Sequence, residues 1–254
     1  MFAQERQNNI LGFLKERPRL SVSELEKLLG ASPATVRRDL GFLEEAGRIF
    51  RTHGGVLSAE QGTGEISYDR RSRHELNAKK AIAETAAGLV KDGHSVFVDA
   101  GTTAFKVGVR LLAREKLTIF TNSVPLLNET PVSGCRLVAL GGEVRAAGLA
   151  LVGSEAIEWM SRIWFDLAFV GTSGIDPEKG PCTTELGEAA VKNAAVRNSR
   201  RAVLLANDSK WGQQAPIRFA HWDDLDDVVT DHRATPHERA ILSSHRVSLH
   251  VVKK

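Results

Sequence analysis

The sequence has only two cysteines, Cys135 and Cys182, and their spacing matches no metal-ligand motif. A disulfide framework and a zinc site are both disfavoured, and we expect reduced thiols and no bound metal. Apolar runs are also short, since none approaches the roughly eighteen consecutive residues of a membrane helix. The start, MFAQERQNNILGFLKERPRL, carries charges where a signal peptide requires an apolar centre. These absences predict a cytoplasmic protein that has no contact with membranes.

A strong charge of one sign is missing as well, because the formal net charge is +3 in 254 residues. This mildly basic balance permits nucleic-acid binding without requiring it, so any DNA-binding site has to be found in local residues. Hydrophobic residues make up 42% and charged residues 26%, which is typical of a globular chain rather than a disordered or fibrous one. The length suits a small domain joined to a larger one.

The first thirty residues predict two helices with well-marked ends. Apolar residues at helical spacing indicate a first helix over residues 4–16, which stops near Pro18. Ser21 and Glu24 match a capping box, and Gly30 is suited to the end of the helix that this box begins. A short, well-delimited second helix is therefore expected directly after the first.

A third helix follows after only two residues, the tight connection of a helix-turn-helix. Ser32 is its expected N-cap, Pro33 occupies its first position, and Gly47 is its expected end. The segment RIFRTHGG then alternates in character and finishes in two glycines, as a short hairpin or wing does.

The face of the third helix that lies opposite its apolar side carries Thr35, Arg37 and Arg38 near the N-terminal half. That half of a recognition helix enters the major groove, where arginine donates two hydrogen bonds to guanine. Threonine contacts phosphate or a thymine methyl group, while Asp39 is expected to pair with a neighbouring arginine. An isolated arginine pair is usually a solvated face, but cap, turn, arginines and wing together predict a DNA-binding domain over residues 1–57.

The rest of the chain alternates between short apolar runs and helical patterns. Small and polar residues begin the segment 58–76, which we expect to be a linker. In residues 77–254 the runs SVFVDA, LTIFTN, CRLVALGG, LAFVGTSG, AVLLAN and DVVTD are candidate strands interleaved with helices. We therefore predict an α/β fold with a mostly parallel sheet for this larger domain.

Polar residues gather directly after the predicted strands. In open α/β sheets the ligand crevice lies at the carboxyl ends of the strands, so these groups are expected to converge on one site. The groups are Asp99, Gly101, Thr102 and Thr103; Thr121, Asn122 and Ser123; Gly141 and Gly142; Gly171; and Asn207, Asp208, Ser209 and Lys210.

The loop after the first of these strands is suited to a phosphate. Gly101 lets the backbone approach closely, Thr102 and Thr103 supply hydroxyls, and the following helix offers free N–H groups. A plain turn in which a threonine caps the helix is an equal alternative. Neither a Walker A motif nor a G-x-G-x-x-G fingerprint is present, so no nucleotide or other cofactor is expected. Lys210 is placed to neutralise an anionic ligand, or to pair with Asp208 at the surface.

The stretch LSVSELEKLLGASPATVRRDLGFLEEAGRIFRTHGG resembles the N-terminal winged helix-turn-helix of the DeoR family of bacterial transcriptional regulators. The resemblance implies that this domain binds double-stranded operator DNA through a reading helix and a wing. The residues implied are Ser32, Thr35, Arg37 and Arg38 on the helix and Arg51 and His53 in the wing.

The motifs DAGTT, TNS, LGG, FVGTSGID, ANDSKWG and VVTD resemble the family's sensor domain, so the likeness spans nearly the whole chain. It implies a fold shared with sugar-phosphate isomerases and coenzyme A transferases. It also implies a phosphorylated sugar or related metabolite as effector, and a homo-oligomer, either dimer or tetramer. The chain departs from the family at Asn207, where aspartate is usual, and one carboxylate fewer repels an anion less and accepts fewer bonds from sugar hydroxyls.

Other titratable residues give weaker indications. Cys182 is expected to be a packed thiol rather than a nucleophile, because no histidine lies near it in sequence. Glu185, Glu188 and Lys192 share one helix face, for which an ion-paired surface is the simple interpretation and a glutamate in the sugar site the sharper one. The scattered histidines that suggest no metal site are His94, His221, His232 and His250.

Basic residues beside the linker are ambiguous. Arg70, Arg71 and Arg73 carry the charge to touch the DNA backbone, yet mixed-charge segments of this kind are usually solvated. Lys79 and Lys80 have the same two interpretations.

Two functions are compatible with these patterns. The leading hypothesis is a DNA-binding repressor of a sugar or carbohydrate operon, whose larger domain binds a phosphorylated sugar and changes DNA affinity. The alternative is a sugar-phosphate isomerase-like enzyme that uses the same pocket with Asp99 or a glutamate as base. No clear acid–base pair surrounds the loop, and an enzyme needs no DNA-reading domain. We therefore rank the regulator first and expect no catalytic residues.

Overall fold

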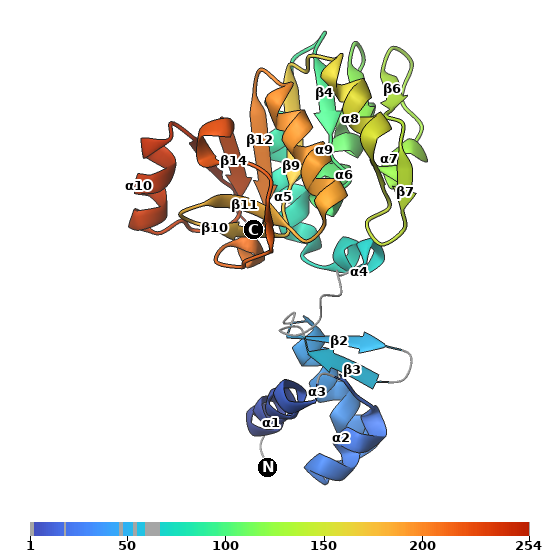
Figure 1. Ribbon diagram of the computed structural model, residues 1–254, viewed down its shortest axis with the longest axis vertical. Helices are drawn as coiled ribbons and strands as arrows, with labels where there is room; N and C mark the ends of the chain where they lie inside the picture. Colours follow the sequence, from blue (N-terminus) through green and yellow to red (C-terminus); the bar gives the residue numbers. More distant parts are fainter. Residues whose placement is uncertain (1–2, 18, 46–47, 53–54, 59–66, 254) are drawn as a thin grey trace. The chain divides into compact units, whose positions relative to one another are not determined.

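The structure is a computed structural model that describes residues 3–17, 19–45, 48–52, 55–58 and 67–253. The chain divides into two compact units, Met1–Glu65 and Ile66–Lys254, each with its own hydrophobic core (Figure 1). None of the described helices is both long and apolar enough to cross a membrane.

The first unit is a winged helix-turn-helix, as the sequence predicts. Its elements are α1 (Ala3–Glu16), β1 (Arg19–Leu20), α2 (Val22–Leu29), α3 (Pro33–Glu45), β2 (Ile49–Thr52) and β3 (Gly55–Ser58). The strands form an antiparallel sheet in the order β1-β3-β2. Side chains such as Leu14, Leu25 and Leu40 are fully buried between the three helices, which fixes α3 against α1 and α2.

The predicted ends of α2 are confirmed. The Ser21 hydroxyl accepts from the Glu24 N–H at 3.2 Å, and the Ser21 N–H donates to the Glu24 carboxylate at 2.7 Å, which completes the capping box. Gly30 ends the helix in the left-handed conformation with φ 59°, where a side chain would be strained.

The first half of the second unit begins with two helices, continues with alternating strands and helices, and finishes with a hairpin and a helix. These are α4 (Tyr68–Arg73), α5 (Leu76–Ala87), β4 (Ser95–Val98), α6 (Thr102–Leu112), β5 (Thr118–Thr121), α7 (Val124–Leu127), β6 (Arg136–Ala139), β7 (Glu143–Arg145), β8 (Ala150–Val152) and α8 (Ser154–Ser161). Its second half consists of β9 (Leu167–Gly171), β10 (Gly174–Asp176), β11 (Gly180–Thr183), α9 (Leu186–Arg197), β12 (Ala202–Ala206), the 3-10 turn η1 (Asp208–Lys210), β13 (Ile217–Arg218), the turn η2 (Trp222–Asp224), β14 (Asp227–Thr230), α10 (Pro236–Ser244) and β15 (Ser248–Val251).

A seven-stranded sheet in the order β15-β14-β12-β9-β4-β5-β6 forms the centre of this unit, and its neighbouring strands are parallel. In Figure 1, α8 and α9 lie on one face and α5 and α6 on the other. Alternate residues of one strand serve opposite cores, since Phe97 packs with Leu204 on the α9 face while Val96 and Val98 pack with Leu205 on the other. This double burial explains why the strands read as continuous apolar runs.

The run LAFVGTSG, expected to be one strand, forms two. β9 stays in the parallel sheet until Gly171, whereas β10 leaves it and pairs antiparallel with β11, which pairs in turn with β13. The Thr172 hydroxyl contacts the Gly174 and Cys182 carbonyls at 2.6 and 2.8 Å, which fixes the bend. The hairpins β7–β8 and β10–β11, the helices α7, α8 and α10 and the edge strand β15 were not expected from the sequence.

Part of the segment expected to be linker belongs to the second unit. α4 lies within residues 58–76, and the Tyr68 ring is buried edge-on against Phe105 of α6, with ring centroids 6.5 Å apart. The Tyr68 N–H also donates to the Ala147 carbonyl at 2.9 Å. An aromatic anchor therefore begins the second unit before residue 77, while residues 59–66 lie outside the described part of the chain.

Candidate functional site

The N-terminal half of α3 presents the side chains that the sequence assigns to DNA. Ser32 caps the helix, because its hydroxyl accepts from the Thr35 N–H at 3.3 Å and also hydrogen-bonds the Thr35 hydroxyl at 2.9 Å. Arg37 and Arg38 are exposed, and Thr35 is partly exposed. Arg51 lies on β2, whereas the predicted wing residue His53 is outside the described residues.

Asp39 anchors this reading helix to the rest of the unit. Its carboxylate is buried and receives two hydrogen bonds from the Arg6 guanidinium of α1, at 2.6 and 3.3 Å. The expected partner was a neighbouring arginine, but Asp39 lies on the inward face between Val36 and Leu40, away from Arg38. The pair sets the orientation of α3 and leaves its arginine face pointing outward.

In the second unit, the loop after β4 leads into α6 without a side-chain cap. Gly101 is the N-cap residue, and because glycine has no side chain it provides no side-chain cap. Thr102 and Thr103 are buried within that turn, so the alternative in which a threonine caps the helix is wrong. The positive end of an eleven-residue helix thus keeps its N–H groups for another acceptor.

Asp99 forms the floor beneath this loop. One of its carboxylate oxygens accepts from the Gly171 N–H at 3.0 Å and from the Lys192 ammonium at 2.5 Å. Both charged side chains are almost completely buried, at 2% and 6% exposure. A Cβ atom on Gly101 or Gly171 would lie 3.3 Å from the same oxygen, so glycine is what allows the two strand ends to approach.

Lys192 was expected on an ion-paired surface, and the structure corrects this. The helix face that carries it is turned toward the strand ends, so Lys192 reaches Asp99 while Glu188, one turn earlier, pairs with Arg145 of β7 at 2.8 Å. Glu185 caps α9 and lies 3.6 Å from the same arginine. Helical spacing identified the shared face but gave no sign that β4 and the β7–β8 hairpin cover it.

Three residues at the end of β5 and directly after it are buried, and their side chains make most of their hydrogen bonds within the fold. They are Thr121, Asn122 and Ser123. The Thr121 hydroxyl donates to the Val98 carbonyl at 2.6 Å and accepts from the Ser123 N–H, and the Ser123 hydroxyl caps α7. The Asn122 amide donates to the Leu151 carbonyl and so holds the β7–β8 hairpin, but its carbonyl oxygen has no hydrogen-bond partner among the described residues. Of these three, Asn122 retains bonding capacity for a ligand.

Gly141 and Gly142 follow β6 at the edge of the sheet, beyond β4 and β5. Gly142 has φ 124°, and a Cβ atom there would lie 2.4 Å from the Val152 carbonyl oxygen. Gly141 faces the Trp159 ring at ordinary contact distance. The two glycines are therefore explained by close packing of the β7–β8 hairpin and α8, and they follow a strand that is two positions away from β4 in the sheet.

Lys210 lies in η1, directly after β12, and it is partly buried. Asp208 does not pair with it but with His232, at 2.6 Å, and His232 also contacts Glu238 at 3.0 Å. Burial alone would lower the pKa of His232, but these two carboxylates outweigh burial and raise it. Asn207 is buried and donates to the Ser209 hydroxyl at 2.9 Å, so it orders the turn that carries Lys210.

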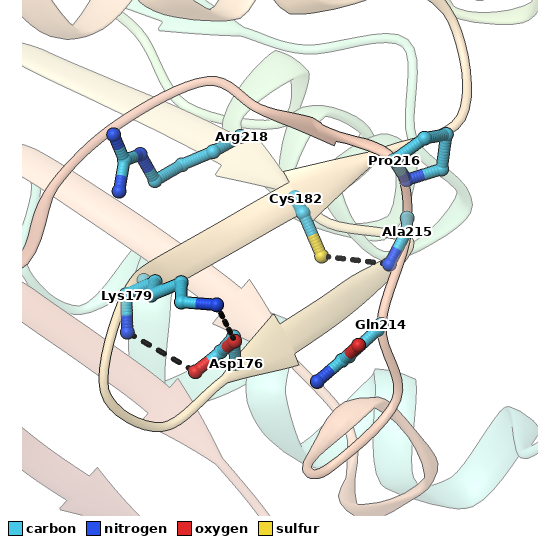
Figure 2. A pocket seen from close by; sticks show the side chains of 8 residues that line it. Asp176, Lys179, Cys182, Gln214, Ala215, Pro216 and Arg218 are labelled. Atoms are coloured by element: carbon cyan, nitrogen blue, oxygen red, sulfur yellow. Dashed lines mark hydrogen bonds and ion pairs between the residues drawn. The ribbon is translucent and has the colours of Figure 1, made fainter.

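A separate pocket of about 330 Å³ lies between the β10–β11 hairpin and the segment that leads into β13 (Figure 2). Asp176 and Lys179 point toward each other across one wall, and Cys182 lies in another, where its sulfur accepts from the Ala215 N–H at 3.1 Å. Burial raises the pKa of the Cys182 thiol, which suits the expected packed role. None of the strand-end residues assigned to the effector lines this pocket.

A DNA-reading winged helix-turn-helix, joined by a short segment to an α/β unit with polar strand ends, is the architecture of a ligand-responsive transcriptional regulator. Comparison with known proteins agrees with this class. Residues 6–62 match the DeoR-like helix-turn-helix domain, and residues 74–232 match the DeoR C terminal sensor domain. The chain belongs to the DeoR family.

Relatives similar over nearly the whole chain are regulators rather than enzymes. The HTH-type transcriptional regulator GlpR of Haloferax volcanii is 35% identical and covers 91% of each chain. The glycerol-3-phosphate regulon repressor of Escherichia coli is 30% identical over 96% of this chain and 97% of its own. Among solved structures, ribose 5-phosphate isomerase A of Methanocaldococcus jannaschii is 19% identical over 54% of each chain, with a TM-score of 0.40.

We predict that Arg38→Ala weakens binding to an operator selected from random duplexes by the wild-type chain. The loss of binding free energy should be about 1–3 kcal/mol if the side chain reads a base. If it contacts only phosphate, the loss should be smaller and the binding constant should depend less steeply on salt concentration. Fluorescence anisotropy at fixed salt measures it. Lys91→Ala, which removes one exposed charge from the other unit, is the control. Unchanged affinity in a folded Arg38 variant removes this residue from the interface.

We also predict that Lys192→Met destabilises the second unit by about 3–5 kcal/mol, because it leaves the Asp99 charge buried without its cation. Chemical denaturation followed by circular dichroism measures the change. The double variant Asp99→Asn with Lys192→Met should recover most of the loss, since no buried charge then remains. A single variant as stable as the wild type would contradict the burial of this pair.

Proposed function

We propose that the protein is a DNA-binding repressor whose second unit binds a phosphorylated sugar or polyol at the strand ends, and that this binding changes its affinity for operator DNA. Arg37, Arg38, Thr35 and Ser32 are the proposed reading residues. The exposure of Arg37 and Arg38 on α3, with Ser32 capping the first turn and Asp39 held inward, supports this assignment.

The observation that carries the effector half of the proposal is the uncapped N terminus of α6. Helix N termini bind phosphate through free N–H groups and the positive end of the helix dipole. A lysine is also present at the strand ends, because Lys210 of η1 directly follows β12, and β12 pairs with β9, whose last residue Gly171 donates to Asp99. A dianionic group would find helix N–H donors and a lysine ammonium group together.

The sugar part is proposed to lie over the floor that Asp99 and Lys192 form, beside the open carbonyl oxygen of Asn122. Asp99 and Lys192 form one buried ion pair, and the Gly171 N–H also donates a hydrogen bond to the Asp99 carboxylate. A carboxylate held in this way accepts hydrogen bonds from sugar hydroxyls and orients them. Recognition of a sugar is the chemistry that such a floor supports.

One relative is named as a glycerol-3-phosphate regulon repressor, which makes glycerol 3-phosphate the first compound to test on this chain. We further propose a homo-oligomer that acts in the cytoplasm, because a two-fold dimer places paired reading helices on related half-sites. Sedimentation velocity of the full chain separates dimer from tetramer. A monomer at micromolar concentration would remove that part of the proposal.

A thermal-shift panel tests the effector class. Glycerol 3-phosphate, several hexose and pentose phosphates and the matching unphosphorylated sugars are added to the full chain at equal ionic strength. A ligand present at about one hundred times its dissociation constant stabilises the native state by about 2.7 kcal/mol, a shift of several degrees in melting temperature. A panel in which no phosphorylated compound raises the melting temperature contradicts the proposal.

We predict that Lys210→Ala weakens the binding of the compound found in that panel at least tenfold and leaves ligand-free operator affinity nearly unchanged. Titration calorimetry and anisotropy measure the two constants, with Lys91→Ala as the matched charge control. If the ligand dissociation constant measured by calorimetry keeps its wild-type value, Lys210 is not part of the proposed site.

A further inference from the structure

The histidine that follows β14 has a carboxylate at each of its two ring nitrogens. Nδ1 of His232 lies 2.6 Å from a carboxylate oxygen of Asp208, the first residue of η1. Nε2 lies 3.0 Å from a carboxylate oxygen of Glu238 in the first turn of α10. The His232 side chain is mostly shielded from water. A single side chain thus joins η1 to α10 directly after the end of β14.

Both contacts of His232 can be hydrogen bonds only when the ring carries two protons. An ionised carboxylate accepts and does not donate. A neutral imidazole has one N–H group, so one of its nitrogens would turn a lone pair toward a carboxylate, whereas the imidazolium donates to both. Burial by itself lowers the pKa of His232, and the two carboxylates more than reverse this, so the pKa is raised. The geometry therefore describes a charged histidine.

Aromatic rings fix the plane of this imidazole. The Trp211 indole is stacked on it, with ring centroids 4.7 Å apart and 18° between the planes, and Trp222 is stacked on Trp211 in turn. The indole N–H of Trp211 and the backbone N–H of His232 both donate to the Thr230 hydroxyl, at 3.2 and 3.0 Å. Because the face of an indole carries partial negative charge, the stack favours the protonated ring.

The two carboxylates that contact the ring are held unequally. The Glu238 side chain is 12% exposed and also accepts from the Thr235 N–H at 2.6 Å, which fixes it as part of the α10 cap. The Asp208 side chain is 52% exposed, and the Asp208 backbone N–H donates to Asp231, the neighbour of His232 in the chain. Loss of a proton from the ring therefore releases Asp208 more readily than Glu238, since water can solvate the exposed carboxylate.

We propose that His232 is a positioning residue of the effector site, whose imidazolium holds Asp208 and thereby the turn η1 that carries Lys210, so that effector affinity falls when the ring loses its proton. This rests on the proposed function, in which Lys210 contacts the ligand. η1 is three residues long, with Asp208 first and Lys210 last. A displacement of Asp208 is therefore passed directly to Lys210. His232 acts through Asp208 rather than by contact with the ligand.

The proposal gives effector binding a defined pH dependence. The ring is charged below its raised pKa, where both carboxylates are held, and it loses its second proton as the pH rises through that value. Above that pH a lone pair of the ring faces a carboxylate, and the hydrogen bond to Asp208 is lost. The ligand should therefore bind more weakly on the alkaline side.

Titration of the wild-type ring tests the charged state without any ligand. Proton NMR of the full chain follows the His232 ring, and the fluorescence of Trp211, which a protonated imidazole quenches, should rise with the same midpoint. We expect this midpoint to lie above the ordinary histidine value of about 6.5. His232→Gln should abolish the fluorescence transition, whereas His237→Gln, which removes an exposed histidine of α10, should retain it. A midpoint at or below the ordinary value overturns the proposal.

Ligand affinity at two pH values tests the positioning. The probe is glycerol 3-phosphate, replaced by the compound with the largest thermal shift if glycerol 3-phosphate gives none. Calorimetry measures its dissociation constant for the wild type and for His232→Gln, and the ratio of the two constants at each pH cancels the protonation of the phosphate itself. We expect His232→Gln to bind about three- to tenfold more weakly at about pH 6 and within about twofold of the wild type at about pH 9.

Asp208→Asn separates positioning from simple attraction of the anion by the imidazolium charge. The variant keeps the cation and removes a carboxylate, so attraction alone predicts tighter binding at about pH 6. Loss of the hold on η1 predicts weaker binding, by about threefold or more. Binding of Asp208→Asn that equals or exceeds that of the wild type overturns the proposal. His237→Gln should match the wild type at both pH values.

The remaining outcomes distinguish this proposal from the proposed function. A His232→Gln ratio that is the same at both pH values shows that His232 acts only through packing, which overturns the positioning role and leaves the proposed function standing. A wild-type chain that binds no phosphorylated compound at either pH removes both. If His232→Gln fails to fold, the wild-type ring titration and the Asp208→Asn constants decide.

Discussion

The buried ion pair between Asp99 and Lys192 is the constraint on which the sensor unit depends. It joins the end of β4 to the middle of α9 across the carboxyl edge of the sheet, at a separation of 2.5 Å. Two charges survive in this interior only because they face each other and because the Gly171 N–H completes the carboxylate's bonding. The glycines at 101 and 171 follow from the same requirement, since a side chain at either would press on that carboxylate.

With this pair fixed, the strand ends divide into two chemically different regions. The opposite charges of Asp99 and Lys192 in the floor balance each other, and the pair is already hydrogen-bonded, which suits recognition of hydroxyl groups. The other region is the N terminus of α6, which begins at Gly101 and has no side-chain cap. In the proposed function, the sugar hydroxyls lie over the floor and the phosphate lies at this helix N terminus.

Much of this architecture could be predicted from the sequence, because it is encoded locally. The capping box at Ser21, the helix start at Ser32 and the apolar runs of the parallel strands depend on spacing within a few residues. The loop at Gly101 was also placed correctly at a strand end. Asp39 was expected in an ion pair, but its partner Arg6 lies 33 residues away. The identity of such a partner depends on tertiary packing and not on the neighbouring sequence.

The site was less predictable for the same reason. Lys192 and Lys79 have the sequence surroundings of surface lysines, and only the elements packed over them make them interior cations. Thr121 and Ser123 have the polarity of ligand-binding residues, yet they bond within the fold. The β10–β11 hairpin was missed because its residues continue the apolar pattern of β9, which does not show the hydrogen bonds that Thr172 makes to the Gly174 and Cys182 carbonyls at the reversal.

The central claim is that ligand at the strand ends and DNA at α3 are coupled. The most direct measurement is the operator dissociation constant of the full chain at fixed salt, with and without a saturating sugar phosphate that raises its melting temperature. Coupling predicts that the constant changes by a factor of about 5 to 150, and that the operator changes ligand affinity by the same factor. Equal operator constants in the presence and absence of a ligand that demonstrably binds would contradict the account.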